Sequence, residues 1–355
     1  MTGERDASIE LRRPAGGASG GAGPVAAPAV AVTASWLQRL PPGLFAIPLG
    51  LIGLAGSWGR LGHADPASAT LAGSVQASLA AVGMAIWATL CLLWALKLLR
   101  HPEQVRGLWG HPLQGSFLAL APVSTLLVVA VVAPTAAHPA LLALLHVLVG
   151  LALALQLTIA WRLVAQLTTG RIGPELVTPA LYLPTVAGGF VGAMALQELG
   201  LHGWAVLLFG IGLGAWALLE ARILHRLFAG PLPMPLRPTL GLELAPTSVG
   251  ALALAVLWPQ LPADVLLVAL GIGTGPALAV LARWRWWTET PFSAGFWSFS
   301  FPIAAYAGAI VEAVRRGGWP LLPAWAAVML ASAVIGYLAW RTLLLWRAGR
   351  LLPPA

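Results

Sequence analysis

The chain has 355 residues, of which 59% are hydrophobic and 9% are charged, and its mean hydropathy is +0.84. Water-soluble domains carry roughly 25% charged residues, so this chain has too few polar residues to cover a globular surface in water. The formal net charge of +8 would suggest a nucleic-acid partner in a soluble protein, but here the arginines stand singly at the edges of apolar runs. The composition therefore predicts a polytopic membrane protein that has no nucleic-acid partner.

The N-terminal segment differs in composition from the rest of the chain. It is rich in Gly, Ala and Pro, and its Ala/Val run at residues 24–34 is broken by Pro28. This run is too weakly apolar to insert as a signal sequence. We expect residues 1–37 to form a disordered cytosolic tail, residues 38–350 to form the transmembrane domain, and residues 351–355 to form a short C-terminal tail.

After the tail, apolar runs alternate with short polar breaks as far as the C-terminus. A helix needs about 20 apolar residues to cross the hydrocarbon core of a bilayer, and ten such helices would use nearly all of the remaining length. The sequence therefore predicts an all-α fold with ten transmembrane helices. The predicted helices are residues 41–59, 71–99, 113–134, 140–164, 178–197, 203–227, 239–258, 263–283, 291–313 and 321–346.

Lysine and arginine are distributed unequally between the two sides of this alternation. Of the 20 Lys and Arg residues, all but Arg60, Arg315 and Arg316 fall on the side that contains both termini. Cytoplasmic loops of membrane proteins carry an excess of these residues. We therefore predict a multi-pass protein of the cytoplasmic (inner) membrane with its N- and C-termini in the cytoplasm.

Proline falls inside every odd-numbered helix but inside only one even-numbered helix. An interior proline removes a backbone hydrogen bond and bends the helix, and within a bilayer the freed carbonyl must be satisfied by protein or water. We expect five helical hairpins around a central pore, with the odd helices inside and the even helices outside, although a single kink is usually a matter of packing. The odd-helix prolines are Pro48, Pro122, Pro184, Pro246 and Pro302, and the even-helix proline is Pro276.

Short motifs in the odd helices resemble a known family. They are Pro42-Gly-Leu-Phe-Ala with the following Gly50-Leu-Ile-Gly, Thr178-Pro-Ala-Leu-Tyr-Leu-Pro-Thr-Val, Leu236-Arg-Pro-Thr-Leu-Gly-Leu-Glu-Leu-Ala-Pro, and Phe296-Trp-Ser-Phe-Ser-Phe-Pro. Together they resemble the tellurite-resistance/dicarboxylate transporter family, which includes bacterial TehA-like proteins, slow-type anion channels of plant guard cells, and fungal malate and sulfite transporters. The resemblance extends over residues 38–350.

This resemblance implies a channel or transporter for small anions, either chloride- or nitrate-like anions or a dicarboxylate, sulfite or tellurite. It also implies a homotrimer with one pore per subunit, and a phenylalanine of the ninth helix that closes the pore. Phe301, directly before Pro302, occupies the matching position, and Phe299 is the alternative if the register differs by two residues. Without the resemblance, a phenylalanine in a membrane helix is most often lipid-facing or packed in the core.

Interrupted helices also suit the transport of anions on chemical grounds. Their half-helix ends present partial positive charge and unpaired N–H groups, and hydroxyl groups can replace part of an anion's hydration. The odd helices have no central Lys or Arg, which favours weak and passing contacts. The predicted pore-lining residues are Phe45, Pro48, Pro122, Ser124, Pro184, Thr185, Pro246, Thr247, Ser298 and Pro302.

Glu243 is the unusual charged residue of the odd helices, because it lies three positions before Pro246 and about one turn inside the seventh helix. Acidic residues within membranes are functional candidates by default. One interpretation is a coupling acid, which would make the protein a proton-coupled secondary transporter of organic anions. The other is an interfacial carboxylate paired with Arg237 or another cytosolic arginine.

Enzyme and cofactor motifs do not emerge from the sequence. The segment Gly271-Ile-Gly-Thr-Gly lies inside an apolar span with no preceding strand, so small-residue helix packing explains it better than a dinucleotide loop. The single cysteine, Cys91, excludes an intrachain disulfide and a cysteine metal site. We predict no catalytic residues, metal or cofactor. We expect small anions and membrane lipids as partners. The alternative from another functional class is an intramembrane enzyme or a scaffold.

Overall fold

The computed structural model describes residues 35–352. Most of the predicted N-terminal tail and residues 353–355 of the predicted C-terminal tail lie outside the described residues. Leu37, which we assigned to the tail, is buried together with Leu40 at the start of the first span. The described chain contains helices and no strand, and ten of its helical segments are long and apolar enough to cross a membrane.

Each odd-numbered span joins one or two short helical segments to a longer α-helix. In chain order, these spans are η1 (Pro42–Phe45) with α1 (Ala46–Ala64), α4 (Pro112–Phe117) with α5 (Leu120–Val132), η5 (Pro179–Leu181) and η6 (Leu183–Ala187) with α7 (Gly188–Glu198), η7 (Met234–Leu244) with α9 (Ala245–Leu257), and η8 (Ala294–Phe299) with α12 (Ser300–Gly317).

Each even-numbered span is dominated by a single α-helix. These helices are α2 (Ala69–Arg100), α6 (Pro139–Thr168), α8 (His202–Ala229), α10 (Ala263–Ala282) and α13 (Leu322–Arg347). The remaining segments are short connections: η2 (Pro66–Ser68), α3 (Pro102–Gly110), η3 (Ala133–Thr135), η4 (Pro174–Leu176) and α11 (Trp284–Thr288).

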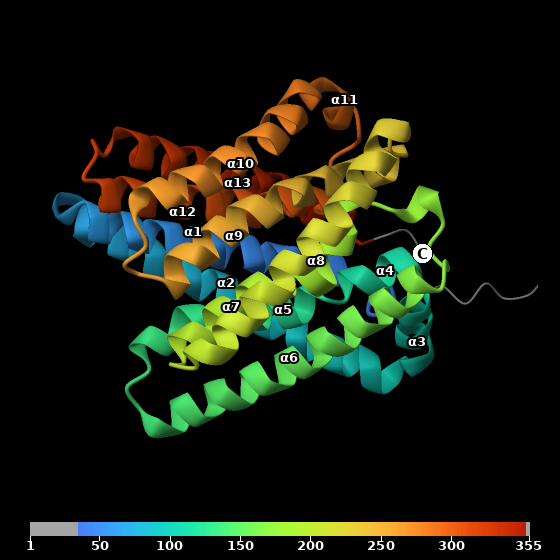
Figure 1. The fold of residues 1–355 in the computed structure, drawn as a ribbon. Coiled ribbons are helices and arrows are strands. Elements are labelled where there is room, and N and C mark those ends of the chain that lie inside the picture. The colour runs from blue at the N-terminus through green and yellow to red at the C-terminus, as the bar shows by residue number, and fades with distance from the viewer. Residues whose placement is uncertain (1–34, 353–355) are drawn as a thin grey trace, which may run out of the picture. The chain divides into compact units, whose positions relative to one another are not determined.

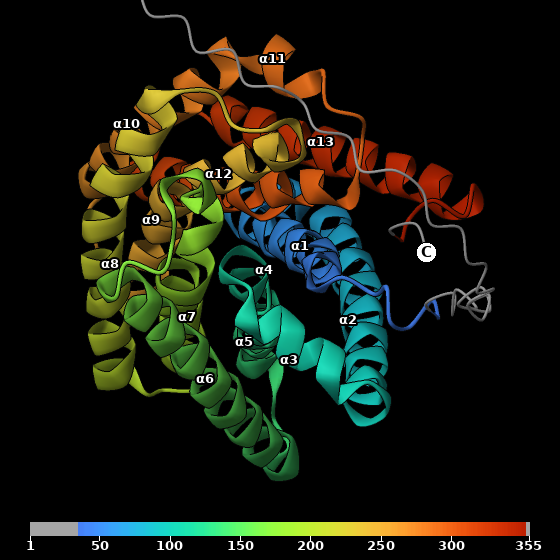
Figure 2. The same ribbon diagram turned by 90° about the vertical axis from the view of Figure 1, so that its right-hand side faces the viewer.

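The two sets of helices form an inner and an outer ring. In the most apolar windows of the odd spans 61–94% of the residues are buried, compared with 17–28% in the even spans. Seen along the bundle, α1, α5, α7, α9 and α12 lie around the centre, and α2, α6, α8, α10 and α13 lie outside them (Figure 2). The predicted arrangement of odd helices inside and even helices outside is confirmed.

Because consecutive spans alternate in direction, the five inner helices all run the same way (Figure 1). We call the end of the bundle at which the first span begins and the tenth span finishes the terminal end, and the opposite end the far end. Every inner α-helix therefore has its N-terminus toward the terminal end and its C-terminus at the far end.

The predicted spans agree with the observed ones except at their ends. The first inner helix continues past residue 59 to Ala64, and the ninth span continues past residue 313 to Gly317. Both extensions contain arginines, which the sequence interpretation took as the borders of apolar runs. Arginine favours helix as well as leucine does and can extend its charged head toward water, so neither helix has to end there.

Two short helices at the terminal end were not predicted. α3 follows α2 directly, and the break between them falls at His101-Pro102 because the residue before a proline avoids the α conformation. α11 similarly connects α10 to the ninth span.

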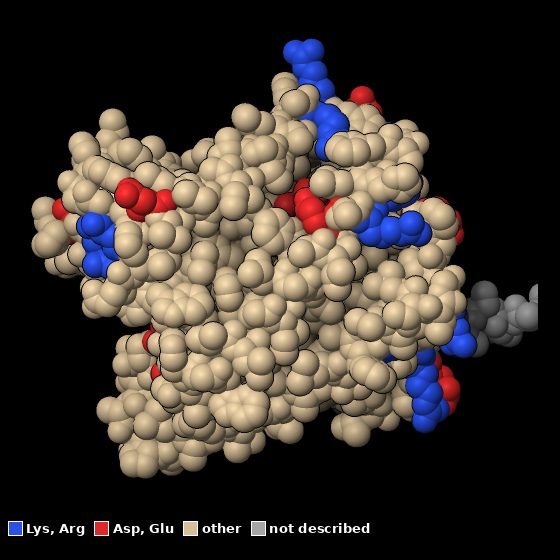
Figure 3. Space-filling model, viewed as in Figure 1, with Lys and Arg blue, Asp and Glu red and all other residues tan. Residues whose placement is uncertain are grey.

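The outer ring presents an apolar band. Charged atoms gather toward the two ends of the face in Figure 3, and the surface between them is almost entirely uncharged. Large apolar side chains on the outer helices remain exposed, including Leu99 at 80%, Leu218 at 81% and Phe228 at 81%. Side chains of this kind would be unfavourable in water over such an area and are suited to contact with hydrocarbon.

Candidate functional site

The inner helices share one construction at their terminal ends. In four of the five, the proline stands at the second or third residue of the long α-helix, as Pro48 does in α1 and Pro302 does in α12. In the fifth, Pro184 is the second residue of the π-helical turn η6 that leads into α7. The interruptions are present, but their form corrects our expectation. The first turn of a helix has no intrahelical partner for its N–H groups, so a proline at this position suits the start of the long helix and does not interrupt its interior.

Outer helices supply polar side chains that bind the backbone of the interrupted segments. The amide nitrogen Nε2 of Gln156 on α6 donates to the carbonyls of Leu183 and Pro184, at 2.9 and 2.7 Å. The Nζ of Lys97 on α2 donates to the carbonyls of Gln38 and Leu40, at 2.9 and 2.8 Å. Both side chains are 2% exposed. Backbone carbonyls just before the first span and in the turn around Pro184 are thus bound by protein side chains, as the bilayer interior requires.

Phe301, the predicted gate residue, is the second residue of α12 and is 4% exposed. Its ring packs against Gly53 of the neighbouring inner helix α1, where a Cβ atom would lie only 2.6 Å from Phe301 Cδ2. Gly53 therefore provides the space that the ring occupies. The two residues lie at an interface between two inner helices.

Phe299, the alternative gate residue, belongs to a separate aromatic cluster. Its ring centroid lies 4.9 Å from that of Trp287 and 6.4 Å from that of Phe296. Phe296 in turn stacks on Phe292 at 5.5 Å, and Phe292 contacts Tyr337 of the outer helix α13. Phe299 is therefore directed toward the connection between α10 and the ninth span.

The predicted lining residues are all buried or half-buried, but their hydroxyls have different partners. Ser124 donates to Ala121 O within its own helix at 2.8 Å, and Ser298 donates to Pro238 O of η7. Thr185 Oγ1 is buried and has no hydrogen-bond partner among the described residues. Phe45 is fully buried at the end of η1.

Glu243 and Thr247 of the seventh span face the outer helices α8 and α10. They line a recess of about 340 Å³, the lateral recess, together with residues of the outer helices α8 and α10 and with Arg283. Both carboxylate oxygens of Glu243 are buried without a hydrogen-bond partner among the described residues. Arg237 pairs instead with Glu289 at 2.9 Å, so the predicted Arg237 pairing is wrong. The other alternative, a different arginine on the same side, is represented by Arg283, which interacts electrostatically with Glu243 but forms no hydrogen bond to it.

A second acid lines the lateral recess. Glu220 of α8 accepts hydrogen bonds from Tyr182 Oη at 2.6 Å and from Trp216 Nε1 at 2.7 Å, whereas the carboxylate of Glu243 accepts none among the described residues. Figure 3 shows acidic atoms in a hollow on this face of the molecule. The lateral recess thus brings two acids to a gap between outer helices.

The terminal end has a larger recess, of about 610 Å³. It is lined by the start of the first span, by parts of α3 and α4, and by Ala294 and Gly295 of the ninth span. Arg39 and Lys97 give this recess a basic character. It lies where the first, third and ninth spans begin.

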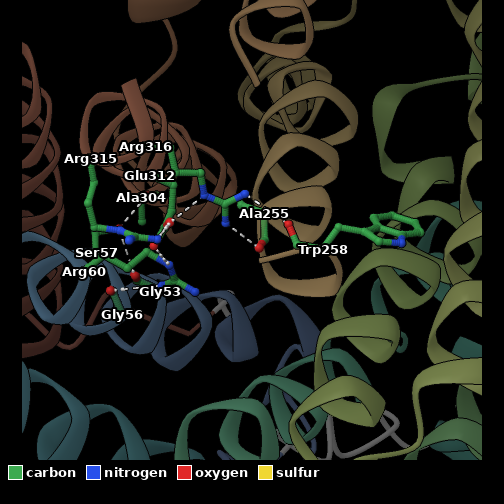
Figure 4. Close-up of polar contacts among 10 residues, drawn as sticks. All are labelled: Gly53, Gly56, Ser57, Arg60, Ala255, Trp258, Ala304, Glu312, Arg315 and Arg316. Carbon is green, nitrogen blue, oxygen red and sulfur yellow. Dashed lines mark hydrogen bonds and ion pairs between the residues drawn. The ribbon is translucent and has the colours of Figure 1, made fainter. Parts of the chain in front are cut away.

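At the far end, three arginines surround one glutamate (Figure 4). Glu312 Oε2 lies 2.8 Å from Arg315 Nη2 and 3.2 Å from Arg316 Nε, and Glu312 Oε1 lies 3.9 Å from Arg60 Nε. We call these four residues the far-end cluster. Arg315 and Arg316 are adjacent in the sequence and lie one turn after Glu312, but nothing in the sequence indicated that Arg60 of the first span would share this acid.

No group of three or more metal-ligating His, Cys, Asp or Glu side chains occurs within residues 35–352. The charged residues of the inner α-helices are limited to Arg60, Glu198, Glu312, Arg315 and Arg316, and all of them lie in the far-end turns of α1, α7 and α12. A ring of uncharged helices with basic groups at both ends is an arrangement suited to negative ions.

Comparison with known proteins identifies this architecture. A family profile described as "SLAC1: Voltage-dependent anion channel" matches residues 39–345. The chain belongs to this family. It is 32% identical over 269 residues to the tellurite resistance protein TehA homolog of Haemophilus influenzae, an alignment that covers 76% of this chain and 79% of the relative.

Plant members of the family are more distant. The S-type anion channel SLAH3 of Arabidopsis thaliana is 26% identical over 288 residues, which are 79% of this chain and 43% of that protein. The guard cell S-type anion channel SLAC1 of the same plant is 24% identical over 334 residues, which are 87% of this chain and 58% of that protein. The chain thus spans about half the length of these plant relatives.

Proposed function

We propose that the protein is a membrane channel that passes small anions along the axis of its inner ring, and that Phe301 closes this path. The observation that carries the proposal is the packing of Phe301 on Gly53, which places a large ring between two inner helices just inside the interrupted segments. A ring at this depth blocks or dewets a narrow path, and its rotation opens it.

Passive conduction fits the distribution of charge. From their first residue to the last turns before the far end, α1, α5, α7, α9 and α12 contain no Asp, Glu, Lys or Arg. An anion that meets only helix N-termini and hydroxyls is held weakly, and weak binding allows it to leave again. Chloride- and nitrate-like ions, dicarboxylates, sulfite and tellurite are the candidate anions.

The test is anion flux into liposomes that contain the purified protein. We expect Phe301→Ala to raise the anion current about tenfold or more, because the ring no longer closes the path. Phe299→Ala is the matched control, since it removes a ring of equal size from the neighbouring aromatic cluster. Unchanged current in a folded Phe301→Ala variant would refute the gate, and reversal potentials across a panel of anions would identify the permeant ion.

A second candidate function is proton-coupled transport of organic anions, because Glu243 is a buried carboxylate with no hydrogen-bond partner in the described chain. Its position in the lateral recess, against α8 and α10, favours a role outside the ion path. A coupled transporter stalls without a proton gradient, and Glu243→Gln would remove its pH dependence. We expect current without a pH gradient and a pH profile that Glu243→Gln leaves unchanged.

We further propose that the terminal end faces the cytoplasm of the inner membrane and that the protein assembles as a homotrimer. The orientation is supported by the excess of Lys and Arg at that end, and the trimer by the resemblance to TehA-like proteins. Protease accessibility of a tag on the C-terminus in inverted vesicles tests the orientation. Native mass spectrometry of the solubilised protein tests the trimer. An enzyme or scaffold would carry no anion flux in the liposome assay.

A further inference from the structure

All five inner helices direct their C-termini to the far end, and this has an electrostatic consequence for an anion channel. The C-terminus of an α-helix carries the equivalent of about half a negative elementary charge. Five parallel helices therefore surround the far mouth with negative partial charge, which repels the ions that the channel is proposed to pass. The terminal end has the opposite, favourable polarity.

The far-end cluster supplies positive charge at this position. It combines three guanidinium groups with one carboxylate, and Glu312 is already bound through Oε2 by Arg315 and Arg316. Arg316 is nearly buried, at 9% side-chain exposure, and it also donates to the carbonyls of Ala255 and Trp258 at the end of α9, at 2.7 and 3.1 Å. The hydrogen bonds of Arg316 therefore connect α12 to the end of α9.

Arg60 has a different position within the cluster. Its side chain is 25% exposed, and its contact with Glu312 is the longest of the three, at 3.9 Å. Its Nη1 donates to the carbonyl of Gly56, one turn earlier in α1, at 3.0 Å. Arg60 also interacts electrostatically with Glu198 at the end of α7, which is separated from α1 in the ring by α5. Arg60 is thus the arginine of the far-end cluster that interacts with acids of two inner helices, α12 and α7.

Arg60 also lies on the same helix interface as the proposed gate. On α1, Gly53 packs against Phe301, Ser57 donates to Ala304 O at 2.7 Å, and Arg60 follows one turn later. On α12, the facing residues are Phe301, Ala304, Gly308 and Glu312. The interface between α1 and α12 therefore extends from the gate to the far-end cluster.

We propose that Arg60 is the anion-entry residue of the far mouth, and that Glu312 is a tethered carboxylate that competes with the entering anion for it. This inference depends on the proposed channel function. Arg60 offsets the field of the five helix C-termini and binds an anion that arrives from the far side. Glu312 keeps that binding weak, because an anion must replace a carboxylate that is already present.

The experiment measures chloride currents in planar bilayers in the Phe301→Ala background, with chloride varied on the far side. We expect Arg60→Gln to reduce chloride entry from the far side about threefold or more at roughly 10 mM salt, and much less at about 1 M, where the Debye length is near 3 Å. Entry from the terminal side should fall less. Arg60→Lys should keep most of the current, and Glu312→Gln should increase far-side entry at low chloride.

Arg347→Gln is the matched control, because it removes the same charge from an exposed position at the terminal end of α13. If Phe301→Ala conducts and Arg60→Gln leaves far-side entry unchanged at low salt, the role of Arg60 is refuted and the channel stands. If Arg60→Gln does not fold, an unchanged far-side current in Glu312→Gln refutes the proposal instead. If no variant conducts any anion, the channel function itself is refuted.

Discussion

The inner and outer helices of this protein satisfy their backbone hydrogen bonds within the membrane in different ways. The outer helices α2 and α6 are uninterrupted over 32 and 30 residues and satisfy their own hydrogen bonds. The inner spans are interrupted near the terminal end and depend on other elements to bind their carbonyls. The comparison shows that the outer ring contributes more than a lipid-facing surface, because it holds the backbone of the inner ring in place.

Among substitutions in the two rings, we expect those of glycine to give the largest difference in the free energy of unfolding. A Cβ atom at Gly189 of α7 would lie 2.5 Å from Gly212 Cα of α8, whereas a Cβ at Gly150 of α6 meets no atom within 4 Å. We expect Gly189→Ala to lower the free energy of unfolding by about 1–3 kcal/mol through overpacking against backbone. Gly150→Ala should leave it unchanged or raise it by up to about 1 kcal/mol.

Thermal unfolding of both glycine variants in the same detergent measures this difference. Equal melting temperatures for Gly189→Ala and Gly150→Ala would contradict the close contact between inner and outer helices.

A smaller loss is expected when Lys97 is replaced by Met, which keeps the apolar stem and removes the ammonium group. The carbonyls of Gln38 and Leu40 then lose their hydrogen bonds, and each unsatisfied buried carbonyl costs about 1–3 kcal/mol, offset in part because a buried charge is also removed. We expect a net decrease in stability of about 1–2 kcal/mol. Arg100→Met, at an exposed position on the same helix, is the control, and equal stability of the two variants would count against a structural role for Lys97.

The smallest effect is expected for Gln156→Leu on α6. Hydrogen bonds between membrane helices contribute about 0.6 kcal/mol on average and up to about 1.7 kcal/mol, and Gln156 makes two of them to the turn around Pro184. We expect the free energy of unfolding to fall by about 1 kcal/mol. We also expect faster hydrogen exchange of the backbone amides around Pro184, including that of Leu183. Thr158→Val, two residues away and exposed, should change neither quantity.

Much of the fold could be predicted from the sequence because the signals are local. Apolar run length, the bias of Lys and Arg, and the alternation of proline between odd and even helices were enough for ten spans in two rings, which the structure confirms. The form of the interruptions could not be predicted in this way. A proline inside an apolar run looks the same in the middle of a helix and in its first turn, and only the backbone hydrogen bonds distinguish the two.

The candidate site was less accessible to sequence reasoning because its contacts join distant residues. Lys97 was one basic residue among many at the terminal end, and Gln156 carried no signal in an apolar run, yet both bind the inner backbone across 27 to 59 positions of sequence. The far-end cluster likewise joins residues of the first and ninth spans. Glu243 was recognised as unusual, but its direction toward α8 and α10 depends on packing that the sequence does not encode locally.

The hydrogen bonds from Gln156 and Lys97 to the backbone of the inner spans have a consequence for how the proposed Phe301 gate moves. A helix that must unwind or slide moves in microseconds to milliseconds, whereas the rotamer change of a side chain that has free space around it is faster. Because the backbone at the starts of the first and fifth spans is held by these side chains, the moving part of the proposed gate is the Phe301 ring that packs on Gly53. Under the proposed function, opening is then a movement of one side chain on a nearly fixed backbone.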